Sequence, residues 1–204
     1  MMSGLTRLVG VTLAALMLVS CLPAPAAAVD AVEVLTKGTW ATGLQLGGGA
    51  QNNVEGHRTI SGVSFVNIEP RVGYFPFEQF GKGWIRGAFE TGLEGWFQYY
   101  LSPEQATAEG LKIALRYHIL GFGPLVPYVE GTAGAAGTSL KVMEIDSPFT
   151  FVLEAGAGLS YFITPGLAVN AGYRFQHISN GHTYDRNRGF NSDSGVIGLT
   201  YYFK

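Results

Sequence analysis

The sequence predicts an all-β protein, an eight-stranded antiparallel transmembrane β-barrel, and three observations support this fold class. Only 14% of the 204 residues are charged, whereas ordinary soluble domains carry about 25%. Beyond residue 30, apolar and polar residues alternate in eight separate runs, and no long segment shows the period of an amphipathic helix. Each run has about the length that a tilted strand needs to cross a bilayer, ~9–11 residues plus overhang.

The first 28 residues are predicted to be a secretory signal peptide, which leaves residues 29–204 as the barrel domain. Arg7 supplies a positive charge before the apolar stretch 8–19, which is too short for a retained transmembrane helix. The alanines at 26–28 offer a cleavage site, and no cysteine follows it, so this interpretation excludes disulfides and cysteine-bound metals. The alternative is a lipoprotein signal, because residues 18–21, LVSC, resemble a bacterial lipobox that would leave a lipidated Cys21 at the mature N-terminus.

The eight predicted strands alternate consistently between an apolar face and a polar face. In the third of them, Phe89 and Leu93 share one face while Glu90 and Glu94 share the other. A soluble barrel would bury its apolar faces, but eight such faces, rich in aromatic residues near the strand ends, suit a surface that contacts lipid. The predicted strands span residues 38–50, 59–75, 84–101, 110–120, 125–138, 149–163, 166–179 and 192–203.

The charged faces then line the barrel interior, where charges must be paired because water is scarce. An eight-stranded barrel is just wide enough to be filled by its own side chains, so we expect an internal ion-pair network rather than a pore. The alternative fold is a periplasmic barrel that binds a lipid inside. The polar faces carry His118 and the expected network members Glu69, Arg71, Arg86, Glu90, Glu94, Lys112, Arg116, Glu130, Glu154 and Arg174.

Connections between the predicted strands alternate between short and long, which is the pattern of outer-membrane barrels. Short links follow the second, fourth and sixth strands, and longer, more polar links such as 51–58 and 181–190 follow the others. With both chain ends in the periplasm, the odd-numbered strands run outward, and the seventh ends at the cell surface. Aromatic girdles are expected at the two membrane interfaces, formed by Trp40, Trp84, Tyr99 and Tyr100.

The seventh predicted strand ends in a His–Ser pair that packing does not explain. Residues two apart in a strand point the same way, so His177 and Ser179 share the apolar, lipid-facing side with Phe175. By the same parity, Asn191 and Asp193 of the eighth strand lie on the outward face beside them. A hydroxyl, an imidazole and an amide or carboxylate therefore converge at the outer-leaflet interface.

Together these groups can activate a serine for attack on an ester. A serine hydroxyl is a poor nucleophile until a neighbouring base takes its proton, and histidine is the usual base near neutral pH. A third group fixes the imidazole tautomer, and Asn180, Asn187 and Gly181 are candidate donors to the oxyanion. The His-x-Ser spacing alone is a weak signal, and the alternative is a set of interfacial polar residues that bond lipid headgroups.

Composition and the isolation of other candidate residues disfavour several further functions. A formal net charge of -2 gives no electrostatic basis for binding nucleic acid. His57 and His118 are isolated and form no ligand cluster, so we expect neither a metal nor another cofactor. Glu90 and Glu94 alternate with interior charges, and we interpret them as structural ion-pair partners.

Residues 175–181, FQHISNG, followed by 187–191, NRGFN, closely resemble the PagL family of outer-membrane lipid A 3-O-deacylases. The family core reads His-x-Ser-Asn, then a short loop with Asn-x-Gly, then the last strand. A weaker likeness extends through residues 127–131 and 156–159. The resemblance implies an outer-membrane barrel, lipopolysaccharide as substrate, and hydrolysis of the 3-hydroxyacyl ester at position 3 of lipid A without a metal.

Carried over by position, the resemblance implies that Ser179 is the nucleophile, His177 the general base and Asn187 a donor to the oxyanion. The third group departs from the family pattern, in which a glutamate occupies the position of Asn191. An asparagine can orient a histidine, but it cannot stabilise the imidazolium as a carboxylate does. Asp193 could take over this role, and Asp185 in the preceding link is a weaker substitute.

This departure keeps a second class of function open, a non-enzymatic outer-membrane barrel for surface protection or adhesion whose active site has decayed. A lipid acyltransferase or a phospholipase is a weaker third alternative. Besides the lipid A substrate, the expected partners are the surrounding outer-membrane lipids. A homodimer that buries the outer wall is left open by the sequence.

Overall fold

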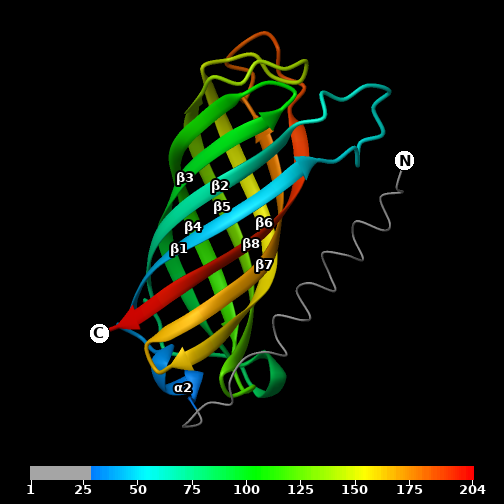
Figure 1. The fold of residues 1–204 in the computed structure, drawn as a ribbon. Coiled ribbons are helices and arrows are strands. Elements are labelled where there is room, and N and C mark those ends of the chain that lie inside the picture. Colours follow the sequence, from blue (N-terminus) through cyan, green and yellow to red (C-terminus); the bar gives the residue numbers. More distant parts are fainter. Residues whose placement is uncertain (1–28) are drawn as a thin grey trace.

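Eight antiparallel strands close into a barrel in the computed structural model, which describes residues 29–204 (Figure 1). Closure is made by pairing of the first strand with the last, which confirms the predicted fold class and leaves no open sheet edge in lipid. The predicted signal peptide, residues 1–28, and the alternative site at Cys21 lie outside the described residues. The strands are β1 (Trp40–Gln51), β2 (Ser64–Tyr74), β3 (Gly87–Ser102), β4 (Ala106–Ile119), β5 (Leu125–Thr138), β6 (Phe149–Thr164), β7 (Leu167–Ser179) and β8 (Phe190–Phe203).

A short helix lies at one end of the barrel, and the C-terminus lies at the same end (Figure 1). This helix, α2 (Ala31–Val34), follows Asp30, whose carboxylate accepts a hydrogen bond from the Val32 amide at 3.0 Å. Leu35 comes next and is fully buried in an apolar cluster with Phe75. We call this the terminal end, and we call the opposite end, which carries the links after β1, β3, β5 and β7, the loop end. Within residues 29–204, no helix is long and apolar enough to span a bilayer.

The strands overlap the predicted runs, but the predicted alternation of link lengths is partly wrong. Residues 103–105 alone connect β3 to β4, so one link at the loop end is short. The link 75–86 at the terminal end is long because it forms the 3-10 helix η1 (Gly83–Ile85) and contacts α2. In that link, the Gln79 amide donates to two carbonyls at the end of α2, at 2.6 and 2.9 Å. The long links at the loop end are 52–63, 139–148 and 180–189.

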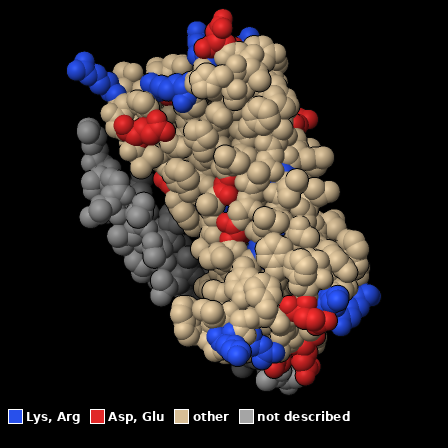
Figure 2. Space-filling model, turned by 180° about the vertical axis from the view of Figure 1, so that it is seen from behind, with Lys and Arg blue, Asp and Glu red and all other residues tan. Residues whose placement is uncertain are grey.

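The outer wall of the barrel is apolar, as the alternation predicts. Figure 2 shows charged side chains gathered at the two ends, with a wide, mostly uncharged belt between them. Leu44, Ile68, Leu111 and Ile197, from four different strands, are each between 47% and 64% exposed on this belt. Soluble proteins bury most residues of this kind, so the belt is a surface for contact with lipid.

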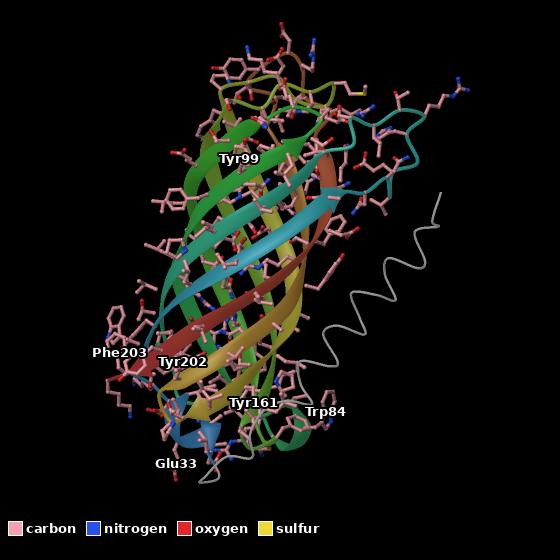
Figure 3. All side chains as sticks on the ribbon, viewed as in Figure 1. Glu33, Trp84, Tyr99, Tyr161, Tyr202 and Phe203 are labelled. Atoms are coloured by element: carbon pink, nitrogen blue, oxygen red, sulfur yellow. The ribbon has the colours of Figure 1, made fainter. Side chains whose placement is uncertain are left out.

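Aromatic side chains lie toward both edges of the belt. Trp84 and Phe203 lie toward the terminal end and Tyr99 toward the loop end, and all three are exposed (Figure 3). The girdle prediction is wrong for Tyr100, which is fully buried. Successive strand residues point to opposite faces, so Tyr99 faces lipid while Tyr100 faces the core.

The interior holds the predicted network of charged side chains, so the alternative of a barrel that binds a lipid inside is wrong. Arg174 is fully buried at the centre of this network. A guanidinium presents five donors in a fixed fork, so one arginine can satisfy several acids. Its partners are the carboxylates of Glu69, Glu94, Glu130 and Glu154.

Further ion pairs extend the network along the barrel axis. Arg71 lies 2.7 Å from a carboxylate oxygen of Glu90, and the imidazole of His118 lies 2.7 Å from the other oxygen. The prediction is wrong for Arg86, which is exposed and donates to Gln79 at 2.8 Å. The reason is that β3 begins at Gly87, three residues later than predicted, so Arg86 belongs to the link and never enters the barrel wall.

Replacing Arg174 with alanine is expected to destabilise the barrel by about 3–5 kcal/mol, because buried carboxylates lose their shared partner. Thermal unfolding of the detergent-folded protein, followed by circular dichroism, measures the effect. Arg86→Ala is the matched control, since it removes an exposed arginine and should leave the unfolding temperature unchanged. Equal unfolding temperatures for Arg174→Ala and the unmodified protein would show that the network does not hold the barrel together.

Candidate active site

The loop end of β7 and β8 carries the residues singled out in the sequence. Ser179 is the last residue of β7, and His177 lies two residues earlier on the same outward face. Both side chains are half-buried. Strand pairing places His177 directly opposite Asn191 and Phe175 opposite Asp193. The site therefore lies on the outer wall, at the edge of the lipid belt.

A hydrogen bond between His177 and Asn191 is the central contact of the site, with 2.7 Å between Nδ1 and Oδ1. An amide oxygen only accepts, so Nδ1 carries the proton and Nε2 keeps its lone pair. Gly189 packs against the ring, because a Cβ at this position would lie 3.2 Å from Cε1 of the imidazole. Its φ of +69° also favours glycine. A glycine at position 189 therefore lets the backbone lie against the imidazole of His177.

The structure does not bring Asp193 to the imidazole. Its carboxylate accepts a hydrogen bond from the Tyr173 hydroxyl at 2.5 Å. Tyr173 lies two residues before Phe175, on the same face of β7. Asp185 is exposed in the link 180–189. Of the three residues that the sequence offers as the third group, Asn191 is the one that contacts His177 among the described residues.

Two asparagines build the turn after β7. The fully buried side chain of Asn180 donates to the Arg186 carbonyl at 2.9 Å and accepts from the His182 amide at 3.0 Å. Asn187 Oδ1 accepts from the Asn180 amide at 2.7 Å, and its Nδ2 lies 3.2 Å from His182 Nδ1. Asn180 therefore holds the turn. The candidate oxyanion donors in this turn are Asn187 Nδ2, whose partner in the described chain is His182, and the Gly181 amide, which has no acceptor within residues 29–204.

Ser179 and His177 make no hydrogen bond to each other in the described part of the chain. Their Cα atoms are two residues apart, about 6.6 Å along an extended strand, so side-chain rotations can bring the hydroxyl and the ring together. Nucleophile–base hydrogen bonds in unliganded hydrolases are often long, and they tighten when substrate binds.

A groove of about 610 Å³ begins at Ser179 and crosses the outer wall. It passes over β5, whose outward residues Ala133 and Ala135 are small, between taller side chains of β4 and β6. Ile113 borders one side and Leu153 the other. The lining is mostly apolar, so the groove suits an acyl chain.

Glu55 also reaches the site, although sequence reasoning misses it. It lies in the link between β1 and β2 and accepts a hydrogen bond from Asn191 Nδ2 at 2.7 Å. Its second oxygen lies 2.8 Å from His57 Nε2, and hydrogen bonds with His57 and Asn191 lower the pKa of Glu55. The link starts beside β8 because Gln51 pairs with Ser192. An acidic residue just after the strand that closes onto β8 is the signal that could have identified it.

One buried carboxylate ties three links of the loop end together. Glu144, in the link between β5 and β6, accepts from the Ser61 amide and from Gln51 Nε2, both at 2.9 Å, and from Arg188 Nη2 at 2.7 Å. Burial alone would raise the pKa of Glu144, but hydrogen bonds from Ser61 and Gln51 outweigh this effect and lower it. The carboxylate is therefore ionised at neutral pH and holds the links beside the site.

The arrangement supports nucleophilic attack by a hydroxyl. An imidazole with a free Nε2 can take the hydroxyl proton, and N–H donors next to Ser179 can stabilise an oxyanion. Within residues 29–204, no group of three or more His, Cys, Asp or Glu side chains is placed to hold a metal ion.

Comparisons with known proteins give the family of the chain and support its barrel fold. The model of a family described as Lipid A 3-O-deacylase (PagL) matches residues 69–200, which include both strands of the site. The crystal structure of the outer membrane enzyme PagL is 16% identical, with a TM-score of 0.57 over 76% of this chain and 97% of that chain. Neisserial surface protein A (NspA) is 17% identical, with a TM-score of 0.53 over 82% of this chain and 100% of that chain. At these identities the two structures establish the fold alone, and no curated protein sequence matches the chain.

Glu144→Ala is expected to loosen the links beside the site while the barrel stays closed. It removes hydrogen bonds to a charged group, each worth about 1.5–3 kcal/mol. Amide hydrogen exchange should rise most at Ser61, which loses its acceptor, and less at Arg188 and Gly189, which donate to the Glu144 carbonyl, while strand amides stay protected.

The pH dependence of this tether follows from the lowered pKa of Glu144. The stabilisation that the tether gives is present above the ordinary carboxyl pKa of 4.5 and is lost as the pH falls through the lowered pKa of Glu144.

The control for Glu144→Ala is Glu78→Ala, which removes an exposed carboxylate at the terminal end. Unchanged exchange in Glu144→Ala would contradict the tethering role.

Proposed function

Because this chain belongs to the PagL family of lipid A 3-O-deacylases, we propose that it removes the 3-O-linked 3-hydroxyacyl chain of lipid A by a serine esterase mechanism. It is a lipid A hydrolase of the outer membrane. The observation that supports the residue assignment best is the His177–Asn191 hydrogen bond beside Ser179 on the lipid-facing wall. Substrate would reach this wall laterally, from the outer leaflet that contains lipopolysaccharide.

In the proposed mechanism, Ser179 is the nucleophile and His177 the general base. Nε2 takes the hydroxyl proton as Oγ attacks the ester carbonyl, and collapse of the tetrahedral intermediate expels the sugar 3-oxygen, which receives that proton. Water then attacks the acyl-enzyme, and His177 takes a proton from water and returns one to Oγ. The products are 3-O-deacylated lipid A and a free 3-hydroxy fatty acid.

Asn191 is the proposed third member of the catalytic group. Its Oδ1 accepts from the Nδ1–H of His177 and so leaves the lone pair of Nε2 available for the serine proton. An amide orients the ring but brings no negative charge, so the imidazolium that forms during catalysis gains less stabilisation than beside a carboxylate.

Asn187 and Gly181 are the proposed donors to the oxyanion. The Gly181 amide has no acceptor within residues 29–204, and Asn187 Nδ2 would exchange its contact with His182 for the oxyanion. The side chain of Asn180, by contrast, is committed to backbone groups of the link. We propose that Asn180 supports the oxyanion site by fixing the turn that carries the two donors.

The groove that begins at Ser179 is the proposed place of the departing acyl chain. Its apolar lining would hold the chain while the ester carbonyl lies at Oγ. Because Ser179 faces lipid, the proposed active form has this wall uncovered, and a homodimer that buried the wall would be latent.

The non-enzymatic barrel is not favoured as an alternative. It drew its support from the asparagine at position 191, yet the family match extends through the strands that carry the site. Asn191 also keeps its hydrogen bond to His177, which a decayed site would not need to retain.

Ser179→Ala is expected to abolish deacylation, with a loss in kcat of about four orders of magnitude or more, because the nucleophile is gone. Mass spectrometry of lipid A, after incubation with purified detergent-folded protein, measures the loss of one 3-hydroxyacyl chain. Ser64→Ala is the matched control, since Ser64 is a half-buried serine at a strand end on the loop end. Undiminished deacylation by folded Ser179→Ala would refute the assignment.

Asn187→Asp separates the two roles of the Asn187 side chain. It keeps an oxygen that can accept from the Asn180 amide but removes the Nδ2 donor. Loss of one oxyanion donor should lower kcat by about 10²–10³-fold with little change in KM, and Asn187→Ala, which also loses the acceptor for the Asn180 amide, should lower it at least as much. A kcat near that of the unmodified protein in Asn187→Asp would mean that Nδ2 does not contact the oxyanion.

A further inference from the structure

We propose that Glu55 is a positioning residue for deacylation, which locks the side-chain amide of Asn191 and thereby sets the tautomer of His177. The inference rests on the proposed function, because it gives Glu55 a role in the same site. Glu55 belongs to the link between β1 and β2, far in sequence from Asn191 and His177. In the described chain it hydrogen-bonds neither the imidazole of His177 nor Ser179.

Asn191 lies between an imidazole and a carboxylate. Its Oδ1 is 2.7 Å from His177 Nδ1, and its Nδ2 is 2.7 Å from Glu55 Oε1. Without the carboxylate, a rotation of the amide by 180° would exchange oxygen and nitrogen, and either could bond the ring, since Nδ1 donates or accepts according to tautomer. A carboxylate only accepts, so Glu55 requires Nδ2 on its own side and leaves Oδ1 for the histidine.

The orientation of this amide decides which imidazole nitrogen can act as a base. With Oδ1 against Nδ1, the neutral ring carries its proton on Nδ1, and Nε2 is free to take a proton from Ser179. With the amide reversed, Nδ1 would have to accept, Nε2 would carry the proton, and the serine would have no base. The charge of Glu55 also polarises the amide and makes Oδ1 a stronger acceptor, which helps to stabilise the imidazolium.

The chain builds a defined turn that holds this glutamate against β8. The Asn52 amide donates to the Asn191 carbonyl at 2.9 Å, which anchors the start of the turn. The Asn53 side chain spans it, accepting from the His57 amide at 2.9 Å and donating to the His57 carbonyl at 2.8 Å. Gly56 inside the turn has a φ of +69°, which glycine adopts without strain. The backbone on both sides of the carboxylate is therefore held in place.

His57 completes the arrangement by holding the second carboxylate oxygen of Glu55 at 2.8 Å. The hydrogen bonds with His57 and Asn191 lower the pKa of Glu55, so the group is ionised and purely an acceptor at neutral pH. Its side chain is still 46% exposed. Because water competes for exposed hydrogen bonds, the expected effect on rate is modest.

The test compares kcat and KM for lipid A deacylation by the unmodified protein and by Glu55 variants. Glu55→Ala should lower kcat about 3- to 10-fold, the contribution of one partly exposed hydrogen bond, with KM unchanged. Glu55→Gln should recover part of the loss, because it keeps one acceptor oxygen at the same reach. Glu104→Ala is the matched control. Glu104 is an exposed carboxylate at the loop end that accepts from the Lys141 amide at 2.8 Å, and its loss should leave kcat unchanged.

A double-mutant cycle shows whether the effect passes through Asn191. In an Asn191→Ala background the intervening amide is absent, so adding Glu55→Ala should change kcat by less than about twofold. An Asn191→Gly background also lacks the amide and gives the same comparison if Asn191→Ala does not fold.

An unchanged kcat in Glu55→Ala, or an equal loss from Glu55→Ala in the Asn191→Ala background, would overturn the inference. A raised KM with unchanged kcat would overturn it too, since that result indicates a role in binding. An unmodified protein that releases no 3-hydroxyacyl chain would refute the proposed function, which is a separate result. In that event, the rate at which a fluorophosphonate labels Ser179, compared with and without Glu55→Ala, still tests the positioning role.

Discussion

The pairing of charges inside a closed, lipid-coated wall is the constraint on which the rest of this structure depends. A sheet in lipid cannot leave backbone groups unpaired, so β1 must meet β8 and the wall must close. Alternation along each strand then sends every second side chain into a narrow interior, where Arg174 and Lys112 each contact several carboxylates. Because this interior is filled, an activity on a lipid has to be built on the outer wall.

The site on that wall is assembled from segments that are distant in sequence but adjacent around the barrel. The register of β7 against β8 sets His177 opposite Asn191. Closure of β1 onto β8 brings the turn that carries Glu55 to the same place. Glu144 then ties three links of the loop end to one another. The position of the site is thus set by the barrel register, and hydrogen bonds between the links hold it there.

The amide at position 191 shapes the proposed chemistry of this enzyme. A carboxylate beside a histidine has no wrong orientation, because both of its oxygens accept. An amide can turn either its oxygen or its NH2 group to the ring, and the neighbouring groups determine which orientation is stable. In the proposed mechanism the chain makes that choice with a carboxylate one hydrogen bond further out, held by a turn of its own.

The sequence by itself determined the number of strands, the faces of each strand, and the presence of His177, Ser179 and Asn191 on one lipid-facing side. All of these follow from the two-residue period of a strand, which is a local property of the chain. Arg86 was misplaced because β3 begins three residues later than predicted, and Tyr100 because neighbouring residues of a strand point to opposite faces. Only the tertiary structure decided that Asn191, and not Asp193, contacts the imidazole, and that Glu55 accepts a hydrogen bond from Asn191. The physical reason is that strand register and barrel closure are long-range pairings, and no local pattern records which residues they bring together.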